Sequence, residues 1–128
     1  MPIRYERDDA RRRVVVTIKG AFAIEDFLAV IERQRGDNAS AYGLLYDLRG
    51  MTGAPTIAEL RQAMSQSVQT HRRRGPLALL ATDPALYDRA YTYAALGYST
   101  LTVGVFRDWG EAEQWLTAQA KAIEQGGA

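Results

Sequence analysis

The sequence predicts a single α/β domain, built on a mixed, mostly parallel sheet of five strands that four helices flank. Short apolar runs alternate along the chain with longer segments in which apolar residues recur at helical spacing. Most of these longer segments begin with a capping residue and end at glycine. Alternation of strands and helices requires crossover connections, which make the joined strands parallel.

The N-terminal segment predicts a hairpin followed by the first helix. Residues 3–6 alternate in polarity, residues 8–10 favour a turn, and the β-branched run 14–19 is typical of a strand. We expect the two strands to pair antiparallel. After Gly20, a helix that ends at residues 36–38 is predicted from apolar residues at helical spacing, namely Phe22, Ile24, Phe27, Leu28 and Ile31.

Two almost continuously apolar runs, residues 43–48 and 77–81, are typical of strands that are covered on both faces. A helix is predicted between them, from Thr56 to about residue 74. Thr56 and Glu59 form a T-x-x-E capping box, in which the hydroxyl accepts from a first-turn N–H and the carboxylate accepts from the Thr56 N–H. Residues 49–55 are therefore predicted to be a loop at a strand end, where ligands and partners bind in open α/β sheets.

The C-terminal segment predicts a helix, a strand and a helix. Asp83 is expected to cap a helix that begins at a proline and runs to about Leu96. The alternating run 101–106 favours a strand near the sheet edge, and Asp108 is expected to cap the last helix. The predicted order is ββαβαβαβα, with the domain spanning 1–122 and a frayed tail at 123–128.

The composition excludes several classes of function. The chain has 128 residues, a formal net charge of +1 and no cysteine. A near-zero charge gives no global field to hold a nucleic acid, and the absence of cysteine excludes thiol catalysis. No stretch approaches the roughly 20 apolar residues that a membrane-spanning helix needs. We expect a cytoplasmic protein without stable membrane insertion and without nucleic acid as a partner.

The element order, the strand end at residues 46–50 and the closing segment 105–116 resemble the STAS-like family of small bacterial proteins. These proteins are similar to anti-sigma-factor antagonists and, in topology, to CRAL-TRIO lipid-transfer domains. In true antagonists, a serine at the start of the helix after the third strand is phosphorylated. The resemblance puts that position at Thr56, where Pro55 replaces the usual aspartate. We therefore predict that Thr56 is a helix cap and not a phosphorylation switch.

The resemblance implies a non-catalytic module whose binding surface begins near the end of the third strand. The residues expected there for a protein partner, for self-association or for regulation are Asp47, Arg49, Thr52 and Thr56. The CRAL-TRIO resemblance implies an alternative, which is a carrier or sensor of a small apolar or amphipathic, lipid-like molecule. The side chains expected to line its pocket are Leu60, Met64, Tyr87, Tyr91 and Trp109. The tyrosines equally suit ordinary packing of a helix on a sheet.

An enzyme is the third hypothesis, because the sequence contains no recognised catalytic motif. His71 is the single histidine, and it continues an apolar helical stripe, which favours a structural or interfacial role. Two short basic runs, residues 11–13 and 72–74, suit solvated surfaces. No phosphate-binding glycine loop and no metal-ligand spacing is present, so neither a cofactor nor a metal is expected.

Overall fold

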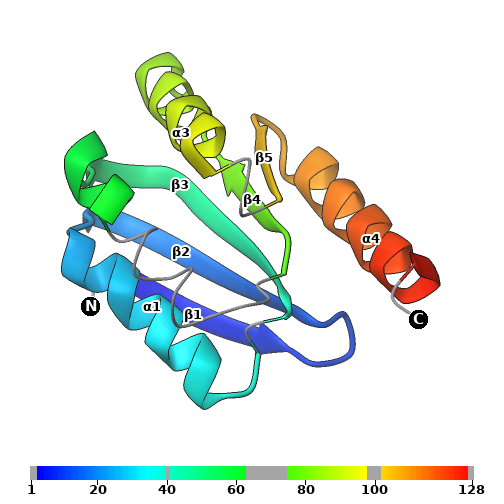
Figure 1. The fold of residues 1–128 in the computed structure, drawn as a ribbon. Coiled ribbons are helices and arrows are strands. Elements are labelled where there is room, and N and C mark those ends of the chain that lie inside the picture. The colour runs from blue at the N-terminus through cyan, green and yellow to red at the C-terminus, as the bar shows by residue number, and fades with distance from the viewer. Residues whose placement is uncertain (1–2, 40, 63–74, 98–101, 127–128) are drawn as a thin grey trace.

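The computed structural model of the chain describes residues 3–39, 41–62, 75–97 and 102–126. Within them, five strands form one mixed sheet in the order β1-β2-β3-β4-β5 (Figure 1). The first two strands are antiparallel and every later neighbour is parallel, as the sequence predicts. The strands are β1 (Ile3–Asp8), β2 (Arg13–Ala21), β3 (Gly43–Gly53), β4 (Leu77–Leu80) and β5 (Val103–Phe106).

Four helices flank the sheet in the part of the chain that the structure describes. They are α1 (Ile24–Gly36), a helix described over residues 57–62, α3 (Pro84–Gly97) and α4 (Trp109–Gly126). The first three connect parallel strands that are neighbours in sequence, and crossovers of one hand place them all on one face. Helix α4 follows the last strand and lies on the opposite face (Figure 1).

The two faces of the sheet bury different side chains because successive strand residues point to opposite sides. Tyr46 and Leu79 are partners in the register and belong to the larger core, under α1 and α3. Leu45 and Ala78 are the next partners, and they belong to the smaller core under α4. Strands β3 and β4 are therefore covered on both faces at this point, as their continuous apolar runs predict.

The structure corrects the predicted end of the third strand. Residues 49–53 were predicted to form a loop, but β3 continues to Gly53 and pairs with the end of β2. Lys19 lies opposite Gly50, and Ala21 lies opposite Gly53. The register shifts once between Thr17 and Lys19 and again between Gly20 and Ala21. A Cβ on Gly50 would lie 2.9 Å from the carbonyl oxygen of Ile18, so a glycine is required for this close approach.

The capping residues act as predicted at two helix starts. The Leu86 N–H donates to Asp83 Oδ2 at 3.1 Å, and the Glu111 N–H donates to Asp108 Oδ2 at 3.0 Å. Helix α1, however, begins at Ile24, so Phe22 precedes the helix in which it was expected.

Three further predictions concern the ends of elements. Helix α4 continues to Gly126, past the expected domain end at residue 122. The predicted run of the second helix to residue 74 falls partly outside the described residues, as does the predicted strand start at Leu101.

Candidate functional site

Asp47 and Arg49 form an ion pair near the carboxyl end of β3, on the face that α4 covers. Residues two apart in a strand share a face, so both side chains project to the same side. Arg49 Nε lies 2.9 Å from Asp47 Oδ1, and Arg49 Nη2 lies 2.9 Å from Oδ2. The Arg49 backbone N–H also donates to Oδ1 at 3.2 Å. This bidentate geometry fixes the plane of the guanidinium.

The two partners differ in exposure. The Asp47 residue is 7% exposed, whereas the Arg49 side chain is 47% exposed. Burial disfavours the carboxylate and acts to raise the pKa of Asp47, but the hydrogen bonds and charge of Arg49 outweigh it. The net result is a pKa of Asp47 below its ordinary value, while the pKa of Arg49 is raised. Asp47 is therefore an ionised anchor, and Arg49 presents the charge to the outside.

Trp109, the first residue of α4, completes this group. The Arg49 guanidinium carbon lies 5.6 Å from the centroid of the Trp109 ring, within the range of a cation–π interaction. Trp109 is half-buried. We call Asp47, Arg49 and Trp109 the rim cluster. Two of these residues come from the expected partner-binding set, whereas Trp109 was expected in a ligand pocket.

The other two residues expected at the partner surface follow along the chain. Thr52 is exposed near the end of β3. Thr56 is exposed and its backbone N–H donates to Glu59 Oε1 at 2.9 Å, while the Glu59 N–H donates to Thr56 Oγ1 at 3.1 Å. Both hydrogen bonds of the predicted capping box are present, so the hydroxyl of Thr56 is engaged in starting a helix.

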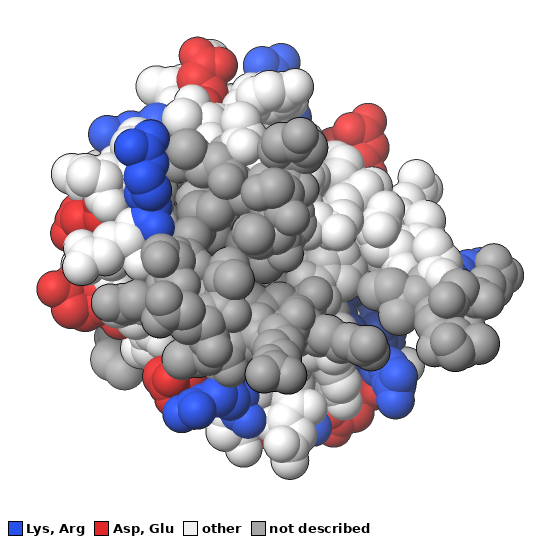
Figure 2. All heavy atoms as spheres, in the orientation of Figure 1, with Lys and Arg blue, Asp and Glu red and all other residues white. Residues whose placement is uncertain are grey.

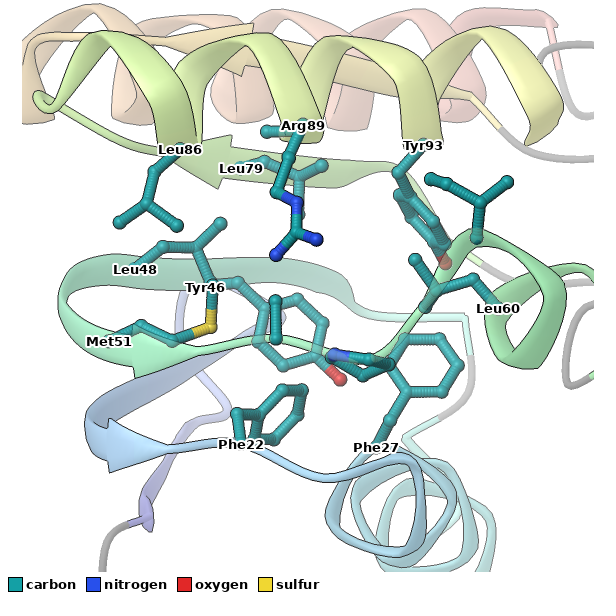
Figure 3. Close-up of a pocket in the computed structure, with 14 residues that line it drawn as sticks. Phe22, Phe27, Tyr46, Leu48, Met51, Leu60, Leu79, Leu86, Arg89 and Tyr93 are labelled. Carbon is teal, nitrogen blue, oxygen red and sulfur yellow. The ribbon is translucent and has the colours of Figure 1, made fainter.

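An apolar pocket lies on the other face of the sheet, bounded by β3, α3 and the helix that begins at residue 57 (Figure 3). Its volume is about 70 Å³. Stacked and edge-on aromatic rings form one wall: the Tyr46 ring centroid lies 6.2 Å from that of Phe27 and 5.9 Å from that of Phe22. The Tyr93 ring, from α3, meets Phe27 edge-on at 5.9 Å. Such a wall is apolar and closely packed.

Arg89 is the one charged residue among the described residues that line the pocket. In Figure 3 its side chain descends from α3 toward the space between Leu48 and Tyr46. Arg89 lines the pocket and is also exposed, so it lies between the apolar lining and the solvent. A cation at the mouth of an apolar pocket gives the pocket an amphipathic character.

The structure does not gather the five residues that were expected to line a pocket. Leu60 lines the apolar pocket, but Tyr87 and Tyr91 do not. The Tyr91 residue is 62% exposed, and the Tyr87 ring lies beneath Arg107, whose guanidinium carbon is 4.2 Å from the ring centroid. Trp109 packs on the opposite face of the sheet. The predicted pocket residue Met64 and the single histidine, His71, lie outside the described residues.

Sequence reasoning missed the α3 residues that do line the pocket. Leu86, Ala90 and Tyr93 are spaced as one helical face, and Arg89 lies beside that face. The helical spacing was available in the sequence. The stripe of Tyr87 and Tyr91 has the same spacing, so periodicity alone did not distinguish the inward face from the outward one.

The surface of the described residues is mixed in charge. Figure 2 shows basic and acidic side chains interspersed around the edge of the face in view, with both signs near one another. No helix in the described part of the chain is both long and apolar enough to cross a membrane. Over the same residues, no group of three or more histidine, cysteine or acidic side chains gathers in a way that could hold a metal ion.

Comparison with solved structures identifies the architecture. An uncharacterized protein of the DUF3478 family with a SpoIIAA-like fold, from Shewanella loihica PV-4, superposes with a TM-score of 0.60 at 14% identity, over 89% of this chain and 91% of that one. The chain has a STAS-like fold. An anti-sigma factor antagonist from Mycobacterium paratuberculosis matches with a TM-score of 0.56 at 16% identity, over 89% and 92% of the two chains. No family model and no curated protein matches the sequence.

The comparison confirms the resemblance to STAS-like proteins at the level of the fold. At 14% and 16% identity, neither match transfers a binding residue to this chain. The rim cluster and the apolar pocket of this chain are therefore its candidate sites.

Proposed function

We propose that this STAS-like domain is a non-catalytic binding module that contacts a protein partner, or a second copy of itself, through the rim cluster. The observation that supports this most strongly is the half-exposed Arg49 guanidinium, which a buried carboxylate orients over the Trp109 ring. Arginine and tryptophan are enriched among the residues that dominate binding energy at protein interfaces. A pre-oriented arginine also loses little side-chain freedom on binding.

The same contacts support a binding role over a catalytic one. Nucleophilic catalysis needs a nucleophile beside a positioned base. Both carboxylate oxygens of Asp47 accept hydrogen bonds from Arg49, and the low pKa of Asp47 makes it a poor base at neutral pH. The Thr56 hydroxyl caps a helix. Each group is occupied in positioning its neighbours.

Quantitative affinity purification from the source organism tests the proposal, with wild-type, Arg49→Ala and Arg49→Lys proteins as baits. Arg35→Ala is a matched control, because Arg35 is also exposed and pairs with a carboxylate, Glu32, but lies on α1. We expect one partner to be retained by the wild type and by Arg35→Ala and lost by Arg49→Ala. Arg49→Lys keeps the charge but not the bidentate geometry, so we expect partial loss.

Circular dichroism of each bait establishes that the fold is intact, and native mass spectrometry reports whether the partner is a second copy. A partner recovered equally with wild-type and folded Arg49→Ala baits would contradict the proposed surface.

A second candidate function is the binding of a small apolar or amphipathic molecule. The observation that favours it is the apolar pocket, with aromatic walls and one cation among the described residues that line it. Small-molecule sites are mostly apolar, with a few polar groups that orient the ligand. Native mass spectrometry of freshly purified protein, before and after mild denaturation, would detect such a ligand as a mass lost on unfolding.

A further inference from the structure

The charge at the mouth of the apolar pocket limits the chemistry of a ligand. Arg89 has an exposed side chain, and no carboxylate of the described residues forms an ion pair with it. Arg13 and Arg49, in contrast, are each paired with a carboxylate of this chain. The guanidinium of Arg89 therefore retains its donors for a molecule that enters the pocket.

The donor geometry favours a planar anion with two oxygens. A guanidinium donates two parallel N–H···O bonds to a carboxylate, which adds direction to the attraction of the charges. Most of the surrounding lining is apolar, and it strengthens the interaction by excluding water. A molecule that complements this site has one carboxylate and an apolar body.

The volume limits the size of that body. The pocket encloses about 70 Å³. An engineered apolar cavity of about 150 Å³ accepts benzene, so this pocket suits a short branched alkyl group and is too small for a long acyl chain. The small volume therefore does not fit the lipid-like ligand that the sequence resemblance implied.

We propose that the apolar pocket binds a short aliphatic carboxylate, with the alkyl group against Tyr46 and Leu60 and the carboxylate on the Arg89 guanidinium. This inference rests on the second candidate function, and it names the ligand class of that pocket. It is independent of partner binding at the rim cluster, which lies on the other face of the sheet.

The test uses 4-methylpentanoate and its neutral analogue 4-methylpentanamide, titrated separately into ¹⁵N-labelled full-length protein. Chemical-shift changes in ¹H–¹⁵N spectra report both affinity and location. For about eight non-hydrogen atoms we expect a Kd near 1 mM for the acid. We expect the amide to bind at least about tenfold more weakly, because it cannot form the charge-assisted pair. The shifts should concentrate at Ala54, Leu86 and Ala90, which line the pocket.

Two variants assign the effect to one arginine. Arg89→Gln removes the charge from an exposed position and should weaken acid binding about tenfold and amide binding much less. Arg61→Gln is the matched control, since Arg61 is exposed and does not line the pocket, so we expect wild-type affinity.

The possible failures are distinguishable. Equal binding of acid and amide, or undiminished acid binding by Arg89→Gln, would overturn the carboxylate inference and leave an apolar ligand as the second candidate. No shift at the pocket with either compound would overturn both the carboxylate inference and the second candidate function. The proposal of partner binding at the rim cluster would be unaffected.

Discussion

The carboxylate of Asp47 accepts its hydrogen bonds from a guanidinium that its own strand supplies two residues further along. Alternation along β3 puts both side chains on one face, and pairing with β2 keeps this part of the strand extended. Burial affects the partners unequally: Asp47 is almost covered, and Arg49 reaches solvent. The cost of covering the carboxylate is offset by hydrogen bonds that hold the arginine in one orientation.

Asp47→Asn should reduce stability at neutral pH by about 1–3 kcal/mol, since it removes a charged hydrogen-bond acceptor from a covered position. The pKa of Asp47 in the folded protein lies below the unfolded value near 3.8. Its stabilisation is therefore fully present above about pH 3.8 and is lost as the pH falls through the lower folded value. Urea unfolding of the wild type and of Asp47→Asn should be measured at pH 7 and through this acid range. The free energies of unfolding of the two proteins should converge as the pH falls.

Glu6→Gln is the control for this measurement, because Glu6 pairs with Arg4 on the surface and both side chains are more than half exposed. Exposed pairs contribute about 0–1 kcal/mol, so we expect little change. If Asp47→Asn lowered the free energy of unfolding as little as Glu6→Gln, the ion pair of the rim cluster would contribute no more than an exposed surface pair.

At the scale of the element, the helix that begins at residue 57 depends on Thr56 and Glu59. Thr56→Ala should lower the free energy of unfolding by about 0.5–2 kcal/mol, because a first-turn N–H loses its acceptor. Thr56→Ser keeps the hydroxyl and should be nearly neutral. Chemical denaturation checks both values. Mass spectrometry of protein from native cells should find no stoichiometric phosphate on Thr56, and such a phosphate would contradict the assignment of this residue as a cap alone.

At the scale of the whole molecule, one sheet separates two cores that share no side chain among the described residues. Val30 of α1 and Leu116 of α4 are both buried, one in each core. Leu116→Ala should lower the free energy of unfolding by about 2–5 kcal/mol. Val30→Ala should cost less, because it removes a smaller side chain. In the double variant we expect the two losses to add within about 0.5 kcal/mol, since the sites have no common partner.

Urea denaturation of the wild type, both single variants and the double variant measures this additivity. A larger coupling energy would mean that the sheet transmits packing strain between its faces.

The parts of the fold that could be predicted depend on local signals. The apolar runs of β3 and β4 and the caps at Thr56, Asp83 and Asp108 involve only near neighbours in sequence, and all of them were correctly predicted. The extension of β3 from Arg49 could not be predicted in this way. Its pairing partner is the end of β2, and its glycines resemble those of a loop.

The candidate site was less predictable because it depends on which helix face meets the sheet. Asp47 and Arg49 are neighbours by strand spacing, but their contact with Trp109 requires α4 to lie across the second face. The pocket required a choice between Tyr93 and the pair of Tyr87 and Tyr91, and both choices fit a helical repeat. Tertiary packing decides between them.

The consecutive strand order has a consequence for how the protein is made. Each strand pairs with the one synthesised just before it, so the N-terminal hairpin can form early and later strands can join an existing edge as they leave the ribosome. Only the connection from β1 to β2 is short, because each later pair of parallel strands is joined by a crossover that contains a helix. Between the synthesis of β3 and that of β4, however, the apolar β3 is the open edge of an incomplete sheet. This interval is when the nascent chain is most exposed to association with other chains.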